Sequence, residues 1–266
     1  MPEKAIHVGI GGWDFDPWRG TFYPLGLPKA RQLEYAGGHL SAIEINATFY
    51  KLQSPELFER WAKAVPENFR FAVKASRFCT NRKNLGDAAE AMGRFLSQGI
   101  TVLGERLGPV LWQLAPTKRF DPAEIRAFLA LLPTRQDGLE LRHAIEVRHE
   151  SFRSREFVAM AASANVAIVF ADSDDYPQIA DLTADFVYAR LQRTREAEGE
   201  GYAPAQLDRW ADIARRWAAG EQPDGLDYVS RRRAPALPRE VFLFVIGGAK
   251  VRNPAAAQAL IARLAD

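Results

Sequence analysis

Short apolar runs, rich in β-branched and aromatic residues, recur along the chain between longer amphipathic stretches. Most of these runs lack clean alternation of polar and apolar residues, which is typical of parallel strands covered on both faces. The pattern predicts eight strands, at Ile6–Gly11, Ala42–Asn46, Arg70–Lys74, Pro109–Leu114, Ala144–Arg148, Val166–Phe170, Phe186–Leu191 and Val241–Ile246.

Helical patterns fill most of the intervals between the predicted strands. Ser54-Pro55-Glu56 and Asp121-Pro122 each place an N-cap residue before a first-turn proline. Leu207, Trp210, Ala211, Ala214 and Trp217 form an apolar stripe at helical spacing. Further helices are expected at Asp87–Gln98, Ser154–Ala164 and Pro254–Ala265. Strands that alternate with helices predict a closed α/β barrel, (β/α)8, that forms a single domain over residues 1–266.

The alternative architecture is an open, doubly wound sheet. Such a sheet normally carries a glycine-rich phosphate-binding turn after its first strand, and Gly9–Trp13 superficially resembles one. However, the residues that follow, Asp14–Trp18, do not open a helix, so this interpretation has little support. The barrel is the favoured fold.

Composition narrows the class of protein further. The chain has 266 residues, 47% hydrophobic and 26% charged, with a net charge of +2, so it has ordinary globular composition. A single cysteine, Cys79, rules out an intramolecular disulfide. The sequence lacks a signal-like apolar segment at its start and any apolar run long enough to span a bilayer. A cytoplasmic protein with no membrane association is expected, and a monomer by default.

Polar residues within or just after the buried strands need an explanation, because an unpaired buried charge costs several kcal/mol. All of them fall late in a predicted strand or just after it: Glu44, Asn46, Lys74, Gln113, Glu146, Arg148, Asp172, Arg190 and Gln192. In barrel enzymes the carboxyl ends of the strands converge on one mouth. A shared ligand pocket is therefore predicted, although a salt-bridge network that fills the upper barrel would place the same residues there.

The residue types suggest acid/base chemistry on an anion. Glu44 and Glu146 could divide the acid and base roles. Lys74 could bind an anion or act as an amine nucleophile, and we take these three as the candidate catalytic residues. Arg148 and Arg190 suit a carboxylate or phosphate. The predicted substrate-binding residues are Trp13, Asn46, Tyr50, Gln113, Arg148, Asp172 and Arg190.

Two of these binding residues come from aromatic segments. The loop that contains Trp13 and the segment that contains Tyr50 could form an apolar rim over the mouth of the barrel. No cofactor or metal is predicted, because the four histidines are not paired at ligand spacing. Magnesium bound by Glu44, Glu146 and Asp172 is a weaker alternative.

Several motifs, taken in order, resemble the YecE-like family, catalogued as domain of unknown function seventy-two. They are GGWDFDPWRGTFYP, IEINATFYKLQSPELFERWAKAVPENFRFAVKAS, GPVLWQL, IEVRHESF and TADFVYARL. The resemblance runs from Val8 to about Leu191, and more loosely to the end. It implies a TIM barrel and brings no established reaction, so fold alone does not give function.

The family's motifs fall on most of the candidate site. The family's E-x-N-x-T-F-Y motif matches Glu44, Asn46, Thr48, Phe49 and Tyr50, and its F-x-V-K motif matches Lys74. The E-x-R-H motif matches Glu146, Arg148 and His149. The tryptophan-arginine-glycine element matches Trp18, Arg19 and Gly20. The chain departs from the family pattern at Asn81, where histidine is usual, at Gln192 and Arg193, where histidine-glycine is usual, and at Ile246 and Gly247, where a pair of asparagines is usual. A mechanism that needs those family residues would not operate here.

Three functions follow from these features. The first is an enzyme, of hydrolase or of lyase or isomerase type, that acts on a small anionic or sugar-like substrate. The second is a nucleic-acid-binding or -processing protein that uses Arg231–Arg233, Arg82, Lys83 and the aromatic rim. The third is a non-catalytic barrel scaffold, to which the departures from the family pattern give some support. The enzyme is favoured, with the reaction left open.

Overall fold

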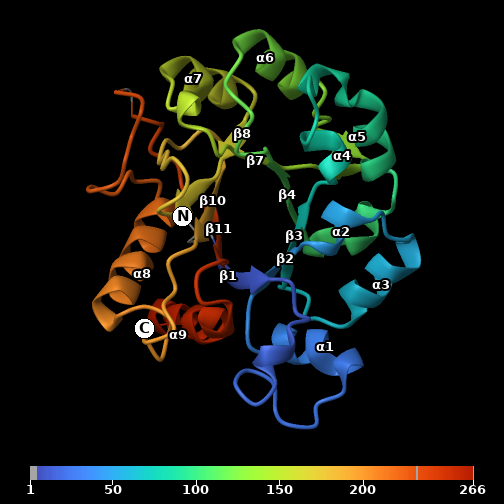
Figure 1. Ribbon diagram of the computed structural model, residues 1–266, viewed down its shortest axis with the longest axis vertical. Helices are drawn as coiled ribbons and strands as arrows, with labels where there is room; N and C mark the ends of the chain where they lie inside the picture. The colour runs from blue at the N-terminus through green and yellow to red at the C-terminus, as the bar shows by residue number, and fades with distance from the viewer. Residues whose placement is uncertain (1–4, 232, 266) are drawn as a thin grey trace.

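A computed structural model of the chain describes residues 5–231 and 233–265. Within these residues, nine parallel strands form one continuous sheet. They are β1 (Ile6–Gly11), β2 (Ala42–Ile45), β3 (Arg70–Lys74), β4 (Leu107–Gln113), β7 (His143–Glu146), β8 (Val166–Ile168), β9 (Phe170–Asp172), β10 (Phe186–Leu191) and β11 (Glu240–Val245). Figure 1 shows the strands at the centre and the helices outside them. The predicted TIM-like (β/α)8 barrel is confirmed.

The predicted sixth strand consists of two short pieces, and these pieces close the sheet. β8 pairs with β7 on one side, whereas β9 pairs with β10 on the other. Only Val169 separates them, and its backbone N–H still donates to the carbonyl of Ile145 at 2.9 Å. One strand therefore changes partner along its length, which joins the two ends of the sheet and leaves eight strand positions around the barrel.

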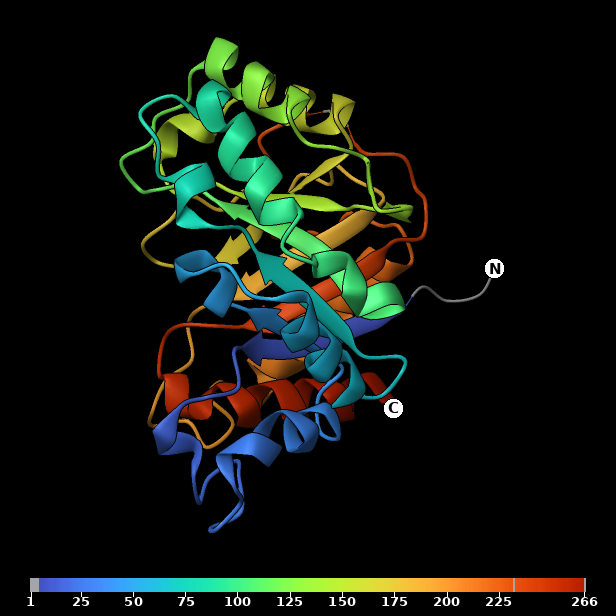
Figure 2. The ribbon, with the colours of Figure 1, turned by 90° about the vertical axis from the view of Figure 1, so that its right-hand side faces the viewer.

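The helices cover the outside of the sheet, as Figure 2 shows from the side. The long ones are α3 (Pro55–Lys63), α5 (Ala89–Leu96), α6 (Pro122–Ala130), α7 (Arg155–Ser163), α8 (Pro204–Ala218) and α9 (Asn253–Ala265). Prolines begin α3, α6 and α8 as expected, and the Asp121 side chain caps α6 by accepting from the backbone of Glu124 at 2.8 Å. The six helices predicted from hydrophobic spacing are thus confirmed, within a few residues at their ends.

The structure also contains short elements that the hydrophobic pattern did not reveal. These are α1 (Gln32–Gly37), α2 (Ala47–Tyr50), α4 (Arg77–Thr80) and an antiparallel hairpin of β5 (Arg135–Gln136) and β6 (Leu139–Glu140). The hairpin turns at Asp137-Gly138, where both residues have positive φ, at 47° and 82°. Asp-Gly is a strong signal for such a turn.

The side chains on the inner faces of the strands change from apolar to polar toward the carboxyl ends of the strands. A buried layer of alanine, aliphatic and aromatic side chains fills the barrel interior, among them Ala42, Ala72, Leu111, Ala144 and Tyr188. Side chains two residues further along a strand point to the same side. Those next residues are Glu44, Lys74, Gln113, Glu146 and Arg190. The polar layer therefore lies directly above the apolar layer, at the carboxyl ends of the strands.

Candidate functional site

Arg190 is the centre of the polar layer. Its guanidinium donates to Oε1 of Glu44 at 3.1 Å and to Oε2 of Glu146 at 2.5 Å. Arg190 is only 3% exposed and both carboxylates are fully buried. Burial alone would lower the pKa of Arg190, but Glu146 and Glu44 raise it above its usual value. The three side chains form a buried ionic cluster that joins β2, β7 and β10.

The remaining oxygens of the two carboxylates are also satisfied. The hydroxyl of Tyr188 donates to Oε2 of Glu44 at 2.8 Å, and the Nε of Arg148 donates to Oε1 of Glu146 at 2.7 Å. Burial alone would raise the pKa of Glu146, but Arg190 and Arg148 hold it below its ordinary value. Glu146 is thus held as an anion, and each carboxylate is fixed by two donors.

Gln113 connects the two arginines. Its side-chain oxygen accepts from Arg148 at 2.9 Å and from Arg190 at 3.3 Å. Arg148 lies at the outer side of this cluster, where its guanidinium also stacks over the ring of Tyr176 at 4.2 Å. One terminal nitrogen of Arg148, Nη1, has no hydrogen-bond partner within the described ranges. The Nε of Arg190 is also unpaired among the described residues but is buried, whereas Arg148 is partly exposed and lines the cavity, so Arg148 is the better placed to donate to a ligand.

Lys74 differs from the arginines because it has no ion pair or hydrogen bond from its amine within the part of the chain that is described. The side chain is 9% exposed and its Nζ lies 4.3 Å from the centre of the Phe49 ring. Burial and the charge of Arg190 lower the pKa of Lys74 to about 8, although Glu44 and Glu146 oppose the change. The amine of Lys74 therefore loses its proton more easily than that of an exposed lysine.

A cavity of about 740 Å³ opens above this cluster. Lys74, Gln113, Arg148 and Arg190 line its polar side. Asn46, Tyr50 and Trp13 line it as predicted, and Trp13 is held edge-on against Trp61 with ring centres 5.2 Å apart. The cavity is large enough for a small organic ligand. The sequence thus predicted most of the residues that the structure brings together.

Two groups of predicted residues occupy different positions. Glu44 and Glu146 lie beneath the cavity, held by Arg190, and do not line it. Asp172 lies apart from the cavity, where its carboxylate pairs with Arg193 at 3.1 Å and accepts from Tyr202 at 3.4 Å. Burial raises the pKa of Asp172, and Arg193 opposes this rise. Asp172 thus fixes the loops after the sixth and seventh strands.

The sequence interpretation missed several residues of the cavity and of the ionic cluster beneath it. Tyr188, two residues before Arg190 on the same strand face, was not singled out as a partner of Glu44. Lys250 lines the cavity and lies 4.2 Å from the Phe15 ring. A side chain at Gly11 would approach Asn46 and Ile246 to about 3.1–3.2 Å, so the glycine keeps the cavity open. Ile246 and Gly247, two of the departures from the family pattern, also line it.

The oxygen ligands proposed for magnesium do not come together. Glu44 and Glu146 meet through Arg190, whereas Asp172 pairs with Arg193. In the described ranges 5–231 and 233–265, no three His, Cys, Asp or Glu side chains form a group suited to a metal ion. Arg232, in the middle of the predicted arginine patch, lies outside the described residues, as do Met1–Lys4.

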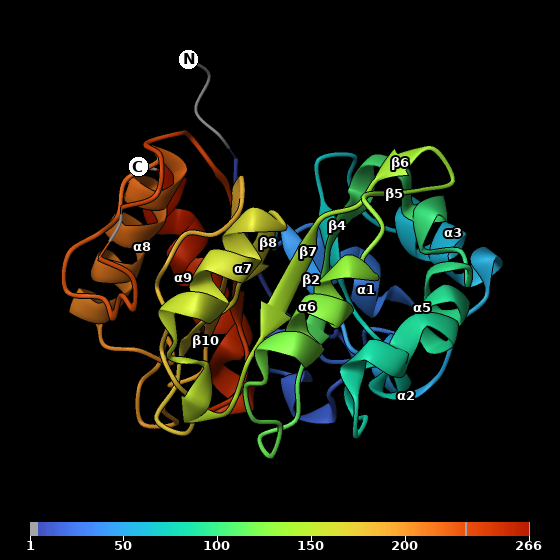
Figure 3. The same cartoon turned by 90° about the horizontal axis from the view of Figure 1, so that it is seen from above.

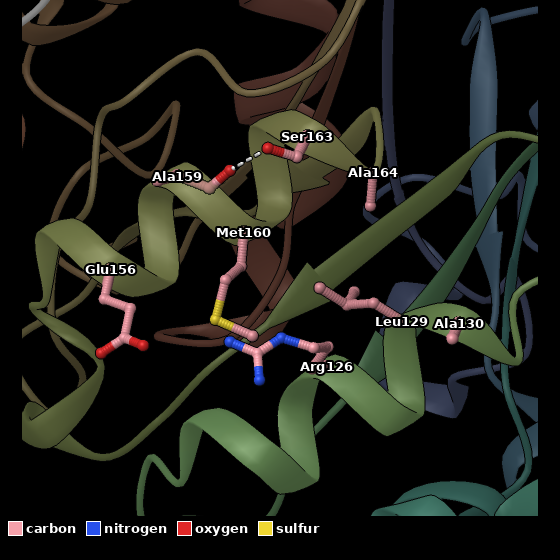
Figure 4. Close-up of a pocket in the computed structure, with 8 residues that line it drawn as sticks. All are labelled: Arg126, Leu129, Ala130, Glu156, Ala159, Met160, Ser163 and Ala164. Carbon is pink, nitrogen blue, oxygen red and sulfur yellow. Dashed lines mark hydrogen bonds between the residues drawn. The ribbon is translucent and has the colours of Figure 1, made fainter.

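A second hollow, of about 430 Å³, lies outside the barrel between α6 and α7. These two helices lie side by side in Figure 3, and Figure 4 shows Arg126 and Leu129 of α6 facing Met160 of α7. The charged residues that line this hollow, Arg126 and Glu156, are exposed at the surface. It brings together none of the residues of the polar layer, so the cavity at the strand ends is the better candidate site.

Fold and site together define a (β/α)8-barrel protein with a charged pocket at the carboxyl ends of its strands. The chain belongs to the family described as protein of unknown function DUF72, whose model matches residues 7–266. None of the helices within the described ranges combines the length and hydrophobicity needed to cross a bilayer.

Individual relatives agree with this assignment. The chain is 30% identical over 150 residues to the UPF0759 protein YecE of Escherichia coli K12, covering 55% of this chain and 50% of YecE. It is 30% identical over 117 residues to YunF of Bacillus subtilis, covering 42% of this chain and 40% of YunF. The matched segments thus span half or less of these relatives.

Solved structures of the same family share the fold over nearly the whole chain. A DUF72 family protein from Thermotoga maritima superposes with a TM-score of 0.69 at 22% identity, covering 97% of each chain. One from Enterococcus faecalis gives a TM-score of 0.67 at 17% identity, covering 98% of this chain and 96% of the other. At these identities the similarity establishes the fold alone.

Proposed function

We propose that the chain is an enzyme that binds a small anionic substrate in the strand-end cavity and acts on it by acid/base chemistry. The observation that carries this proposal is Lys74, an unpaired amine with a pKa near 8 on the wall of a 740 Å³ cavity. A group whose pKa lies near the working pH exchanges protons efficiently. Arg148, with its free donor, binds the anion.

The other charged residues support Lys74 and Arg148. Glu44 and Glu146 hold Arg190, and their negative charges stabilise the protonated form of Lys74. A direct role for either carboxylate in proton transfer stays a prediction, because both have their oxygens occupied by donors. In the proposal they position and tune the cluster, and Lys74 exchanges the proton with the substrate.

Binding and proton exchange are measured separately. A set of small carboxylates and phosphates is titrated by calorimetry, and each is incubated in deuterated water and followed by proton NMR. We expect at least one anion to bind, and Arg148→Met to weaken its binding at least about tenfold through loss of a charge-assisted hydrogen bond. Lys74→Met is expected to retain binding and to lose enzyme-dependent deuterium exchange.

Arg94→Ala is the matched control, because Arg94 is an exposed arginine on α5 in an ion pair with Glu90. It should change neither readout. The proposal is wrong if no anion binds, or if Arg148→Met and Arg94→Ala behave alike. Retention of DNA or RNA on filters at low salt, together with absence of small-anion binding, would instead favour the nucleic-acid-binding function. Anion binding without exchange on any compound would favour a non-catalytic barrel.

A further inference from the structure

The amine of Lys74 is suited to more than proton exchange. Other buried cations of the site, such as Arg190, have carboxylate partners, whereas Lys74 contacts the face of Phe49. The two arginines of the cluster lower the pKa of Lys74 and so oppose the two glutamates, which raise it. An amine in such a desolvated site can attack an electrophilic carbon.

We propose that Lys74 forms an iminium with the carbonyl carbon of a 2-oxo acid bound in the cavity. This inference rests on the proposed function only in that the cavity binds an anion. In the net exchange a carbon–nitrogen bond forms and the carbon–oxygen double bond breaks. The carbonyl oxygen leaves as water with two protons of the lysine ammonium, and the third proton stays on the iminium nitrogen. No oxidant or reductant is needed.

The neutral amine required for the attack is available at ordinary pH. With its pKa lowered to about 8 by burial, Lys74 is unprotonated in roughly one molecule in ten at pH 7. The iminium keeps the single positive charge of the ammonium it replaces. The buried ionic cluster below therefore faces the same net charge before and after the reaction.

The carboxylate of a 2-oxo acid matches the donors beside Lys74. Carboxylate and carbonyl carbon are adjacent atoms in such a compound, so a guanidinium close to the lysine can bind one while the amine attacks the other. Arg148 contributes its charge to Lys74 and keeps Nη1 unpaired within the described residues. Trp13, Phe49 and Ile246 provide apolar wall for the rest of the molecule.

The test is chemical trapping with pyruvate and sodium borohydride. Hydride reduces an iminium to a stable secondary amine, which intact-mass measurement and peptide mapping detect. We expect a single adduct on Lys74 in the wild-type protein and none in Lys74→Met. Lys51→Met, which removes an exposed lysine outside the cavity, is the matched control and should give the wild-type adduct.

A second comparison tests the role of the carboxylate. Acetone has a carbonyl but no carboxylate, so it should give at least about tenfold less adduct than pyruvate at equal concentration. Arg148→Met should reduce the pyruvate adduct by a larger factor than the acetone adduct, because it removes the partner of the carboxylate as well as a charge that lowers the pKa of Lys74. Circular dichroism and the melting temperature establish that each variant is folded.

Each result separates the two proposals. No adduct, or an adduct spread over surface lysines, overturns the iminium, and if small carboxylates still bind in calorimetry the proposed function stands. If no carboxylate binds and no adduct forms, both fail. Equal trapping of acetone and pyruvate overturns the assignment to 2-oxo acids.

Discussion

The guanidinium of Arg190 donates to the carboxylate of Glu146 at 2.5 Å, although the strands that carry them, β10 and β7, are not neighbours in the sheet. Between β7 and β10 lies the sixth strand, which consists of β8 and β9, and the ion pair spans its inner side. Arg190 takes both carboxylates, and Lys74 has no carboxylate partner among the residues that the structure describes.

Removing Arg190 should destabilise the fold. In Arg190→Met, Glu44 and Glu146 lose their shared cation while they remain buried. We expect the free energy of unfolding to fall by about 3–5 kcal/mol. Chemical denaturation measures this change. Arg94→Ala, which breaks an exposed ion pair with Glu90, should cost less than about 1 kcal/mol. Equal costs would show that the buried cluster contributes no more than a surface pair.

Labelling of Lys74 should follow its lowered pKa. Modification by a small acylating reagent, followed by mass spectrometry across pH, should reach half of its maximum near pH 8. The neighbours predict opposite shifts in two variants. Glu44→Gln removes a charge that raises this pKa and should move the midpoint down. Arg148→Gln removes a charge that lowers it and should move the midpoint up. Shifts in the same direction would contradict the proposed electrostatics.

Glu240, at the amino-terminal end of the barrel, should contribute to stability in a pH-dependent way. Burial alone would raise its pKa, but hydrogen bonds from His7 and Arg142 lower the pKa of Glu240 from 4.5 to about 2. A carboxyl with a lowered pKa in the folded state stabilises the protein above its unfolded pKa, and this contribution is lost as the pH falls through the folded value.

The melting temperature of Glu240→Gln should therefore lie below that of the wild type above pH 4.5, and the difference should shrink as the pH falls toward about 2. Glu59→Gln, in an exposed pair with Lys63, should have little effect at any pH. A difference between wild type and Glu240→Gln that does not change with pH would disprove the assigned role.

Filling the cavity at Gly11 should affect binding more than folding. Gly11→Val places carbon atoms against the side chains of Asn46 and Ile246, which a Cβ alone would approach to about 3.1–3.2 Å. Calorimetry with any anion bound by the wild type should show a loss of about tenfold or more, equivalent to about 1.4 kcal/mol. Gly93→Ala on α5, where nothing lies within 4 Å of the new carbon, should bind normally and gain about 0.5–1 kcal/mol of stability. Similar affinities in the two variants would exclude Gly11 from the site.

The barrel could be predicted from the sequence because buried parallel strands have a strong signature. The predicted bounds of Arg70–Lys74 and Phe186–Leu191 agree with β3 and β10 at both ends. The break at Val169 could not be predicted, because a change of pairing partner depends on neighbouring strands and leaves no trace in local hydrophobicity. Short helices such as α2 (Ala47–Tyr50) contain too few turns to show a period.

The candidate site could be predicted in composition but not in connectivity. The position of Glu44, Lys74, Glu146 and Arg190 late in their strands predicted that they converge, and the structure brings them into one cluster. Arg190 forms ion pairs with both carboxylates because its side chain is long enough to contact residues on two other strands. Strand positions alone do not show this, so the sequence did not predict that Lys74 would lack a carboxylate partner. The prediction that Asp172 lines the pocket was wrong, because its carboxylate pairs with Arg193 instead. Arg193 belongs to a loop, where no sequence pattern predicts the direction of a side chain.

The pairing of β1 with β11 also constrains how the chain is made. Ile6 lies opposite Val241, so one partner of the first strand is synthesised more than two hundred residues after it. Until then one edge of β1 offers unpaired backbone groups to any other extended chain. A ribosome that stalls before residue 240 would therefore release a polypeptide with an open sheet, whose disposal depends on chaperones and proteases rather than on its own folding.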